Sequence, residues 1–295
     1  MENSVRNLIN QEKCIQCKLC IKVCPCNIIG VDENNEVNFI EEKEAICIKC
    51  GQCMAICRSR ACYVSDLSYI NFNDMPKPDI LHKDFMDFLS TRRSTRNYSN
   101  RPVTKEVLDQ VLESVSYAPY GASPEKMHIT VINNRQKIEE SLQHISDFLD
   151  NIIKWMENPV ASYIIKRKSG MEQFNTIRNH IYPIAKTGNY NLEKGDRISR
   201  GGPVLMIFHA DKAAEAHTDN SFIYATYAML AAHSLGLGSC MNGIIPAAIN
   251  KLPEVKKLFS IPEGHEAIIS LSLGYPKYKY KRTIKRLDHK THYVN

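Results

Sequence analysis

The sequence predicts an α+β fold in two domains of unequal size, and three observations lead to this prediction. The chain has 295 residues, which at about 150 residues per domain is enough for two domains. Ten of the 11 cysteines lie before residue 63, so the N-terminal part differs in composition from the rest. Beyond residue 83, helical patterns dominate and short apolar runs are far apart in the chain, as in an α+β domain.

Composition excludes several classes of protein. Hydrophobic residues make up 43% and charged residues 24% of the chain, which is typical of globular proteins and unlike disordered or collagen-like chains. The longest apolar run, 222–232, is shorter than the roughly 20 residues that span a bilayer. The N-terminus lacks the pattern of a signal peptide. We therefore expect a cytoplasmic protein with no membrane partner, whose thiols stay reduced and whose cysteines have a role other than disulfides.

Eight cysteines form two runs with identical spacing. Each run reads C-x2-C-x2-C-x3-C, and each cysteine of the first has a counterpart 33 residues later. Three thiolates of such a run can hold three corners of an iron–sulfur cube, while the fourth ligates the cube of the other run. The spacing therefore predicts two [4Fe-4S] clusters. The expected ligands are Cys14, Cys17, Cys20 and Cys57 for the first cluster, and Cys47, Cys50, Cys53 and Cys24 for the second.

Other cysteine chemistries fit this pattern less well. A disulfide framework needs an oxidising compartment, and a zinc site would use paired C-x2-C hooks. Haem attachment needs His after C-x-x-C, where Lys18 and Gly51 stand. Residues of about 5–65 thus resemble bacterial two-cluster ferredoxins, with Arg58 departing from the usual proline after the last cysteine. Cys26 and Cys62 are expected to be small buried side chains near the clusters.

Local patterns predict the other elements in order. Apolar residues on both sides of an Asp-Glu-Asn-Asn turn at 32–35 predict two short strands, and residues 66–82 are a linker without periodicity. Residues 157–202 combine five glycines with scattered basic residues, so we expect an irregular lid or binding loop. Apolar spacing and Pro or Gly boundaries predict helices at 85–89, 105–117, 136–156, 219–235 and 246–259, and strands at 129–132, 203–209 and 268–273.

An arginine-rich segment is the second chemical signal. Three guanidinium groups and a hydroxyl lie within five positions, at Arg92, Arg93, Ser94 and Arg96. Arginine binds phosphate oxygens in a bidentate manner, so the segment suits a phosphate; a solvated basic loop is the alternative. Aromatic residues are not interleaved with it and no nucleic-acid-binding motif occurs, so we expect no nucleic-acid partner.

Four motifs in the same order make residues 83–288 similar to the FMN-dependent nitroreductase family. They are RRSTR at 92–96, APYGAS at 118–123, LGLGSCMNG at 235–243, and LGYP at 273–276 before a basic tail. The resemblance implies a central, mainly antiparallel sheet flanked by helices, and a homodimer with FMN in its interface. The whole chain then resembles a ferredoxin–nitroreductase fusion, with a cluster domain at 1–65, a linker at 66–82 and an FMN-binding domain at 83–295.

The resemblance also implies a set of flavin-binding residues. The arginine-rich segment would hold the phosphate and ribityl chain, the second motif would lie along the flavin from the partner subunit, and the third would line the ring. Glu125-Lys126-Met127 replace the family's Gln-Pro-Trp, so the substrate pocket is expected to differ. The implied residues are Arg92, Arg93, Ser94, Arg96, Pro119, Tyr120, Gly121, Ser123, Cys240, Met241, Asn242, Gly243 and Arg282.

The expected function is that of an FMN-dependent oxidoreductase. Electrons would pass from the two clusters to FMN and on to a small aromatic, nitro or otherwise electron-poor substrate, with a ferredoxin or NAD(P)H as donor. No catalytic acid or base is required from the protein, and Cys240 is expected to be a packing residue. Two alternatives remain open: a reductase of the same fold acting on an enone or carbon–halogen bond, and a redox sensor or electron carrier without an organic substrate.

Overall fold

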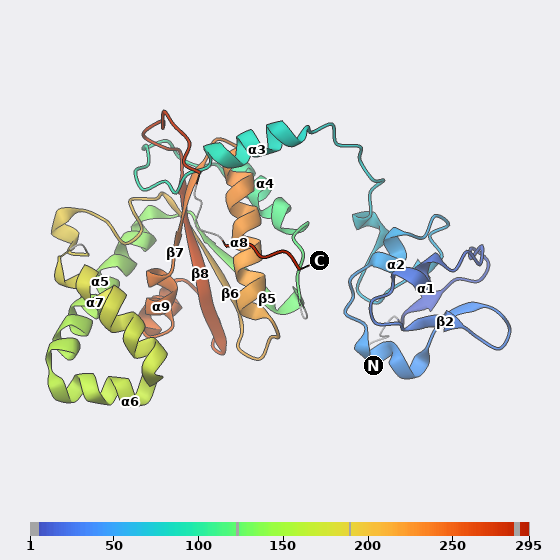
Figure 1. The fold of residues 1–295 in the computed structure, drawn as a ribbon, viewed down its shortest axis with the longest axis horizontal. Helices are drawn as coiled ribbons and strands as arrows, with labels where there is room; N and C mark the ends of the chain where they lie inside the picture. The colour runs from blue at the N-terminus through green and yellow to red at the C-terminus, as the bar shows by residue number, and fades with distance from the viewer. Residues whose placement is uncertain (1–5, 122–123, 189, 286–289, 295) are drawn as a thin grey trace. The chain divides into compact units, whose positions relative to one another are not determined.

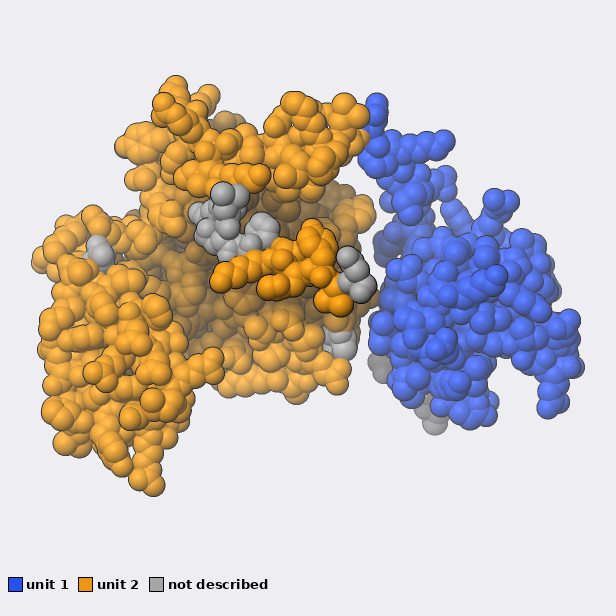
Figure 2. Space-filling view, in the orientation of Figure 1, with its two compact units in different colours: residues 1–79 blue, residues 80–295 orange. Residues whose placement is uncertain are grey.

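The computed structural model describes residues 6–121, 124–188, 190–285 and 290–294. The chain divides into two compact units, Met1–Asp79 and Ile80–Asn295, which Figure 2 shows in blue and orange. The division falls within the segment 66–82. Within the described ranges, none of the helices has both the length and the apolar composition that crossing a membrane requires.

The first unit is built from two small antiparallel sheets and two short helices. Strand β1 (Leu8–Ile9) pairs with β4 (Cys62–Tyr63), and β2 (Ile29–Val31) pairs with β3 (Val37–Phe39). Asp32 closes the β2–β3 turn, because its Oδ1 accepts hydrogen bonds from the backbone N–H groups of Asn34 and Glu36, both at 2.9 Å. The remaining elements of this unit are α1 (Leu19–Val23), the 3-10 helix η1 (Glu41–Ile46), α2 (Gln52–Ala55) and the 3-10 helix η2 (Tyr69–Asn71).

The 33-residue repeat of the sequence is also a repeat of the backbone. Helices α1 and α2 begin at equivalent positions, and each follows a residue in the left-handed conformation, Lys18 with φ 60° and Gly51 with φ 70°. Two further equivalent pairs have positive φ: Gln16 with Lys49, and Asn27 with Arg60. Lys18 therefore adopts in the first repeat the left-handed conformation that Gly51 adopts in the second. This conformation costs less free energy for glycine than for lysine.

The second unit is an antiparallel sheet between two layers of helices, as the resemblance implied. Its strands are β5 (Met127–Ile132), β6 (Val204–Asp211), β8 (His265–Gly274) and β7 (Gly238–Asn242), in that spatial order. Successive side chains of a strand point to opposite faces. Leu205 and Ile207 therefore pack in one core and Met206 and Phe208 in the other.

The two cores are covered by different helices (Figure 1). One core contains α5 (Arg135–Glu157), α9 (Ile244–Ile249) and α10 (Pro253–Leu258). The other contains α4 (Lys105–Val115) and α8 (His217–Ser234), and α8 contacts all four strands of the sheet. Helix α3 (His82–Thr91) is the first helix of this unit.

Two predicted segments differ in the structure. The single helix expected at 246–259 is the pair α9 and α10, because Pro253 disfavours the helical conformation at Leu252, which is extended with φ −116° and ψ 100°. Strand β7 was not predicted, since its sequence GSCMN is short and lacks alternation. It forms because β8 offers a partner along its whole length.

The expectation of an irregular loop at 157–202 is wrong. Most of the segment is helical, in α6 (Pro159–Thr176), a π-helical turn (Ile177–Ile181) and α7 (Tyr182–Lys186). Asn158 caps α6, because its Oδ1 accepts from the N–H groups of Val160 and Ala161 at 2.9 and 3.1 Å. Gly170 interrupts the helix with φ 77°, which breaks the apolar periodicity and conceals the helix in the sequence.

Candidate functional site

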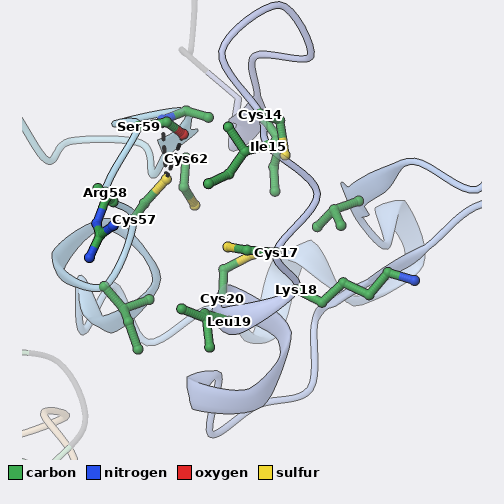
Figure 3. A pocket seen from close by; sticks show the side chains of 14 residues that line it. Cys14, Ile15, Cys17, Lys18, Leu19, Cys20, Cys57, Arg58, Ser59 and Cys62 are labelled. Atoms are coloured by element: carbon green, nitrogen blue, oxygen red, sulfur yellow. Dashed lines mark hydrogen bonds between the residues drawn. The ribbon is translucent and has the colours of Figure 1, made fainter.

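Four of the predicted ligand cysteines line one cavity in the first unit. Cys14, Cys17 and Cys20 come from the first run and Cys57 from the second, and all four side chains are directed toward the same space (Figure 3). We call these four residues the first cluster site. Apolar side chains such as Ile9, Ile15 and Val37 line the rest of the cavity. Residues 37 or more positions apart thus meet because the β1–β4 pairing closes the small unit.

The other four predicted ligands line a separate cavity. Cys47, Cys50 and Cys53 come from the second run and Cys24 from the first. We call these four the second cluster site. It too is lined by apolar side chains, including Ile28, Ile29, Phe39 and Val64. The structure therefore groups the eight cysteines four and four, each set combining three from one run with one from the other.

The thiols of each site also interact electrostatically. Burial, together with negative charge on Cys57, Cys14 and Cys17, raises the pKa of Cys20 to about 11. Burial likewise raises the pKa of Cys47, with contributions from Cys53, Cys50 and Cys24. Thiols with raised pKa values keep their protons at neutral pH. A metal that takes them as thiolates therefore has to displace protons, which couples its binding to pH.

Two further cysteines lie at these cavities. Cys26 lines the second cavity and is half-buried. Cys62 lines the first cavity and is 1% exposed, and its hydrogen bond with Cys53 raises the pKa of Cys62. Cys62 is therefore a buried thiol, whereas Cys26 is more exposed than the sequence suggested. In the sequence, the only indication that Cys26 and Cys62 lie at the cavities was their proximity to the two cysteine runs.

In the second unit, the arginine-rich segment lies beside strand β7. Ser94 forms a parallel bridge with Ser239, and the Thr95 N–H donates to the Ser239 carbonyl at 2.9 Å. Gly238 permits this approach, because a Cβ at that position would lie 2.2 Å from the Thr95 Oγ1. Two motifs that are separated by more than 130 residues in the sequence are thus held together at the edge of the sheet.

The predicted phosphate-binding residues surround a small polar cavity. Its volume is about 170 Å³, and Arg92, Arg93, Ser94 and Arg96 all line it. The Arg93 guanidinium lies 5.0 Å from the centre of the Tyr280 ring, a distance typical of a cation–π contact. Positive side chains around a hollow of this size suit a phosphate group.

The basic C-terminal tail contributes a different residue from the one predicted. Tyr280 and Ile284 line the polar cavity, whereas Arg282 is exposed and is not among the lining residues. Tyr280 also lines a neighbouring cavity of about 500 Å³ together with Tyr275 and Tyr278. The alternating tyrosines of YPKYKY were the missed signal, since the prediction considered only the basic residues between them.

The third motif spans the junction of β7 and α9. Cys240 is 6% exposed, and its Sγ contacts the Met241 carbonyl at 3.5 Å. The Asn242 Oδ1 accepts from the N–H groups of Ile244 and Ile245 at 2.9 and 3.4 Å, which caps α9. Gly243 is the residue before that helix. The motif thus sits next to the arginine-rich segment, but the Asn242 side chain is occupied by the cap.

The second motif lies at the other end of helix α8. The Gly121 N–H donates to the Asn220 Oδ1 at 2.7 Å, near the start of α8, with Pro119 and Tyr120 just before it in the chain. Arg92 contacts the Met229 Sδ at 3.5 Å, near the end of α8. Nine helical residues separate these contacts by roughly 14 Å. One chain therefore does not bring these two motifs together; Ser123 lies outside the described residues.

Three histidines gather at the end of the sheet farthest from the arginine-rich segment. The Nδ1 atoms of His209 and His265 are 3.0 Å apart, and the Thr130 Oγ1 lies 3.0 Å from the His209 Nε2. The rings of His128 and His209 are stacked with their centres 5.6 Å apart. Burial, together with the neighbouring His265, His128 and Lys256, lowers the pKa of His209 to about 4. His209 is therefore neutral at physiological pH.

Comparison with known proteins identifies both parts of the chain. The family model of the nitroreductase family matches residues 89–275, more than half of the chain. The chain belongs to the nitroreductase family. A 4Fe-4S dicluster domain matches residues 6–58. The predicted fusion is thus confirmed, and the protein is an oxidoreductase.

Individual relatives of this nitroreductase-family chain are distant. One from Methanothermobacter thermautotrophicus, named provisionally as an NADH dehydrogenase/NAD(P)H nitroreductase, is 24% identical over 197 residues, covering 65% of this chain and 78% of the relative. One of the same name from Archaeoglobus fulgidus is 22% identical over 195 residues, covering 66% and 87%. A Bacteroides fragilis nitroreductase structure with bound FMN has a TM-score of 0.52 at 19% identity, covering 72% of this chain and 99% of that one. The last similarity shows a shared fold.

Proposed function

We propose that this chain is an FMN-dependent oxidoreductase that takes up electrons at two [4Fe-4S] clusters and reduces a small electron-poor substrate at the flavin. The observation that carries the proposal is the presence of both kinds of site in one chain. Two cavities are each lined by four cysteines, and a polar cavity is lined by three arginines and a serine.

The residues of the first unit fit two clusters. Each cavity offers four thiols in an apolar surrounding, and cysteine thiolates are the usual ligands of such clusters. The ligands would be Cys14, Cys17, Cys20 and Cys57 in one site, and Cys24, Cys47, Cys50 and Cys53 in the other. Metal binding would also stabilise a unit whose core is small.

The residues of the second unit fit FMN, the cofactor bound in the similar Bacteroides fragilis structure. Arg92, Arg93, Ser94 and Arg96 would hold the phosphate and ribityl chain, and residues 240–243 would line the ring next to them. Tyr280 would orient Arg93 through its ring. Arg282, which we predicted as a phosphate ligand, is exposed on the tail and does not line the polar cavity. It would have to approach the phosphate from outside this cavity.

The second motif supports a homodimer. Pro119, Tyr120 and Gly121 lie at the opposite end of α8 from the arginine-rich segment, so one chain does not complete the flavin site. In a dimer, Pro119, Tyr120, Gly121 and Ser123 of the second copy would lie along the flavin. Sedimentation analysis should then give a dimer when FMN is bound, and a monomer that retains FMN would contradict this arrangement.

The division of chemistry explains why the two units are joined. Clusters exchange single electrons, whereas bound FMN can collect two and reduce an organic group. The chain's own residues therefore have to bind and orient the cofactor and substrate and shield them from side reactions. No side chain is assigned as a catalytic acid or base. Cys240 is a packing residue, since it is buried against Met241.

The family and its relatives support a substrate class and a donor. We assign a small aromatic, nitro or otherwise electron-poor acceptor, and either a ferredoxin or NAD(P)H as donor, since the two archaeal relatives are named for NAD(P)H-linked activity. We place the protein in the cytoplasm, because ligand thiols need a reducing compartment.

Anaerobic purification with iron and flavin analysis tests the proposal. We expect about eight iron atoms and one FMN per chain. Arg93→Gln should lower FMN affinity about tenfold or more, since a charge-assisted hydrogen bond is lost, and Arg167→Gln, an exposed arginine on α6, should leave it unchanged. Fewer than about six irons, or no flavin, would contradict the two-site proposal.

Reoxidation of the reduced protein separates the enzyme from the alternatives. A nitroaromatic acceptor should reoxidise it much faster than buffer does. Faster reoxidation by an enone or a halogenated compound would instead favour the related reductase activities. If no organic acceptor exceeds buffer, a sensor or electron carrier becomes the better explanation.

A further inference from the structure

The internal repeat makes the two cluster sites directly comparable. Three pairs of positions 33 residues apart share a left-handed backbone conformation, and equivalent positions of the two repeats line the two cavities. The ligands are identical, so any difference between the clusters must come from the other residues around them. Four lining positions differ in charge or in hydrogen-bonding capacity, and at one of them Cys62 stands at the first cavity where Ile29 stands at the second.

Two of these positions carry a positive charge at the first site alone. Lys18 lines the first cavity where Gly51 lines the second, and Arg58 lines the first where Pro25 lines the second. Both cationic side chains are exposed, so solvent reduces their effect without abolishing it. Lys18 also adopts φ 60°, a conformation that is uncommon outside glycine.

The third position differs in a hydrogen bond to a ligand sulfur. The Ser59 Oγ lies 3.7 Å from the Cys57 Sγ (Figure 3), and once Cys57 is a thiolate the hydroxyl has to be the donor. The Ala61 N–H donates to the same sulfur at 3.2 Å. Cys26 stands at the position equivalent to Ser59, and a thiol is only a weak donor.

Two contacts would stabilise negative charge at the second site, but they are weaker than those at the first. Cys62 shares a hydrogen bond with Cys53, but its donor is a thiol. Lys49 is the cation of the second repeat where the first has Gln16, but Asp66 pairs with it and so offsets its charge. Exposure adds to the difference, since Cys17 is exposed and its equivalent Cys50 is half-buried.

Reduction adds negative charge to a cluster. Nearby cations, hydrogen bonds to the sulfurs and solvent exposure all stabilise the reduced form, and these are the factors that set cluster potentials. We propose that the cluster at Cys14, Cys17, Cys20 and Cys57 has the higher reduction potential, set by Lys18, Arg58 and Ser59. The first electron that enters the unit therefore resides there. This inference rests on the proposed function, because it requires both clusters.

A repeat-swap experiment on the full chain tests it. Lys18→Gly, Arg58→Pro and Ser59→Cys, combined, give the first site the residues of the second at these three positions. Redox titration followed by electron paramagnetic resonance should show the higher midpoint falling while the lower one stays. We expect about a tenfold change in the ratio of reduced to oxidised cluster, which is about 59 mV for one electron.

The reverse change provides a second, independent variant. Cys26→Ser gives the second site a hydroxyl and should raise the lower midpoint. Lys43→Gln removes an exposed charge that lines neither cavity and should move neither midpoint. If the triple variant loses iron, the two single variants provide the test. Ser59→Cys should lower the higher midpoint, and Cys26→Ser should raise the lower one.

The outcomes separate this inference from the proposed function. A first-site variant that shifts the lower midpoint, or a triple variant with full iron that shifts neither, would overturn the ordering and leave the function intact. A wild-type protein without two cluster transitions would overturn the proposed function, and the ordering with it.

Discussion

The two units of this chain assemble their sites in opposite ways. In the first unit, the eight cysteines that we propose as ligands occur within 44 residues (14–57), and the spacing within each run indicates the chemistry. In the second, the polar cavity joins residues 89–96 to residues 280–284, almost 200 positions later. The first kind of site depends mainly on local geometry and, as proposed, on metal, whereas the second depends on a folded sheet that holds distant motifs together.

The strongest test of this difference removes a cluster ligand. Cys53→Ser should lose the second cluster and destabilise the whole first unit, because among the described residues 6–79 its core cluster has only nine buried members, Cys53 among them. The second unit, with two larger cores, should keep its fold. Iron analysis and limited proteolysis would measure both effects. Cys240→Ser, outside the first unit, is the control and should keep all its iron; full iron in Cys53→Ser would contradict the ligand assignment.

Acidification should act on the second unit through His209. Its pKa is about 4 in the folded chain and near 6.5 when unfolded, so between these values the unfolded chain binds a proton that the folded chain does not. The free energy of unfolding should therefore fall by about 3 kcal/mol as the pH drops from about 6.5 to 4.

Denaturant titrations across this pH range would measure the fall. His209→Gln should flatten the pH dependence, whereas His180→Gln, an exposed histidine, should leave it unchanged. An unaltered slope in His209→Gln would show that other groups are responsible.

A smaller effect is expected where the arginine-rich segment meets β7. Gly238→Ala places a Cβ 2.2 Å from the Thr95 Oγ1 and 2.6 Å from the Thr95 Cβ, so the two segments have to separate. Overpacking of this kind costs about 1–3 kcal/mol, and FMN affinity should fall with it.

Gly243→Ala is the matched control for stability, because nothing lies within 4 Å of a Cβ at that position. Thermal unfolding should show a lowered melting temperature for Gly238→Ala alone. Equal melting temperatures for the two variants would mean that the close approach is not needed.

The same difference explains what the sequence could predict. The three cysteines that each run contributes to one cavity followed from spacing, because short-range geometry places them together, and the repeat of the spacing indicated that the fourth comes from the other run. The positions of Tyr280 and of the Asn242 cap did not, because they depend on which strands become neighbours. Strand β7 was missed for the same reason: its pairing with β8 is a tertiary contact. Helix α6 was missed because Gly170 breaks its pattern, although Asn158 and Pro159 do mark its start.

Residues 72–81, which span the division between the two units, contain no helix or strand, and several of their apolar side chains, such as Met75 at 90%, are exposed. Ten extended residues reach at most roughly 35 Å. A tether of this length keeps the local concentration of one unit near the other on the order of millimolar. The electron delivery that we propose within one chain should then be independent of how dilute the protein is, which a separate carrier protein cannot achieve.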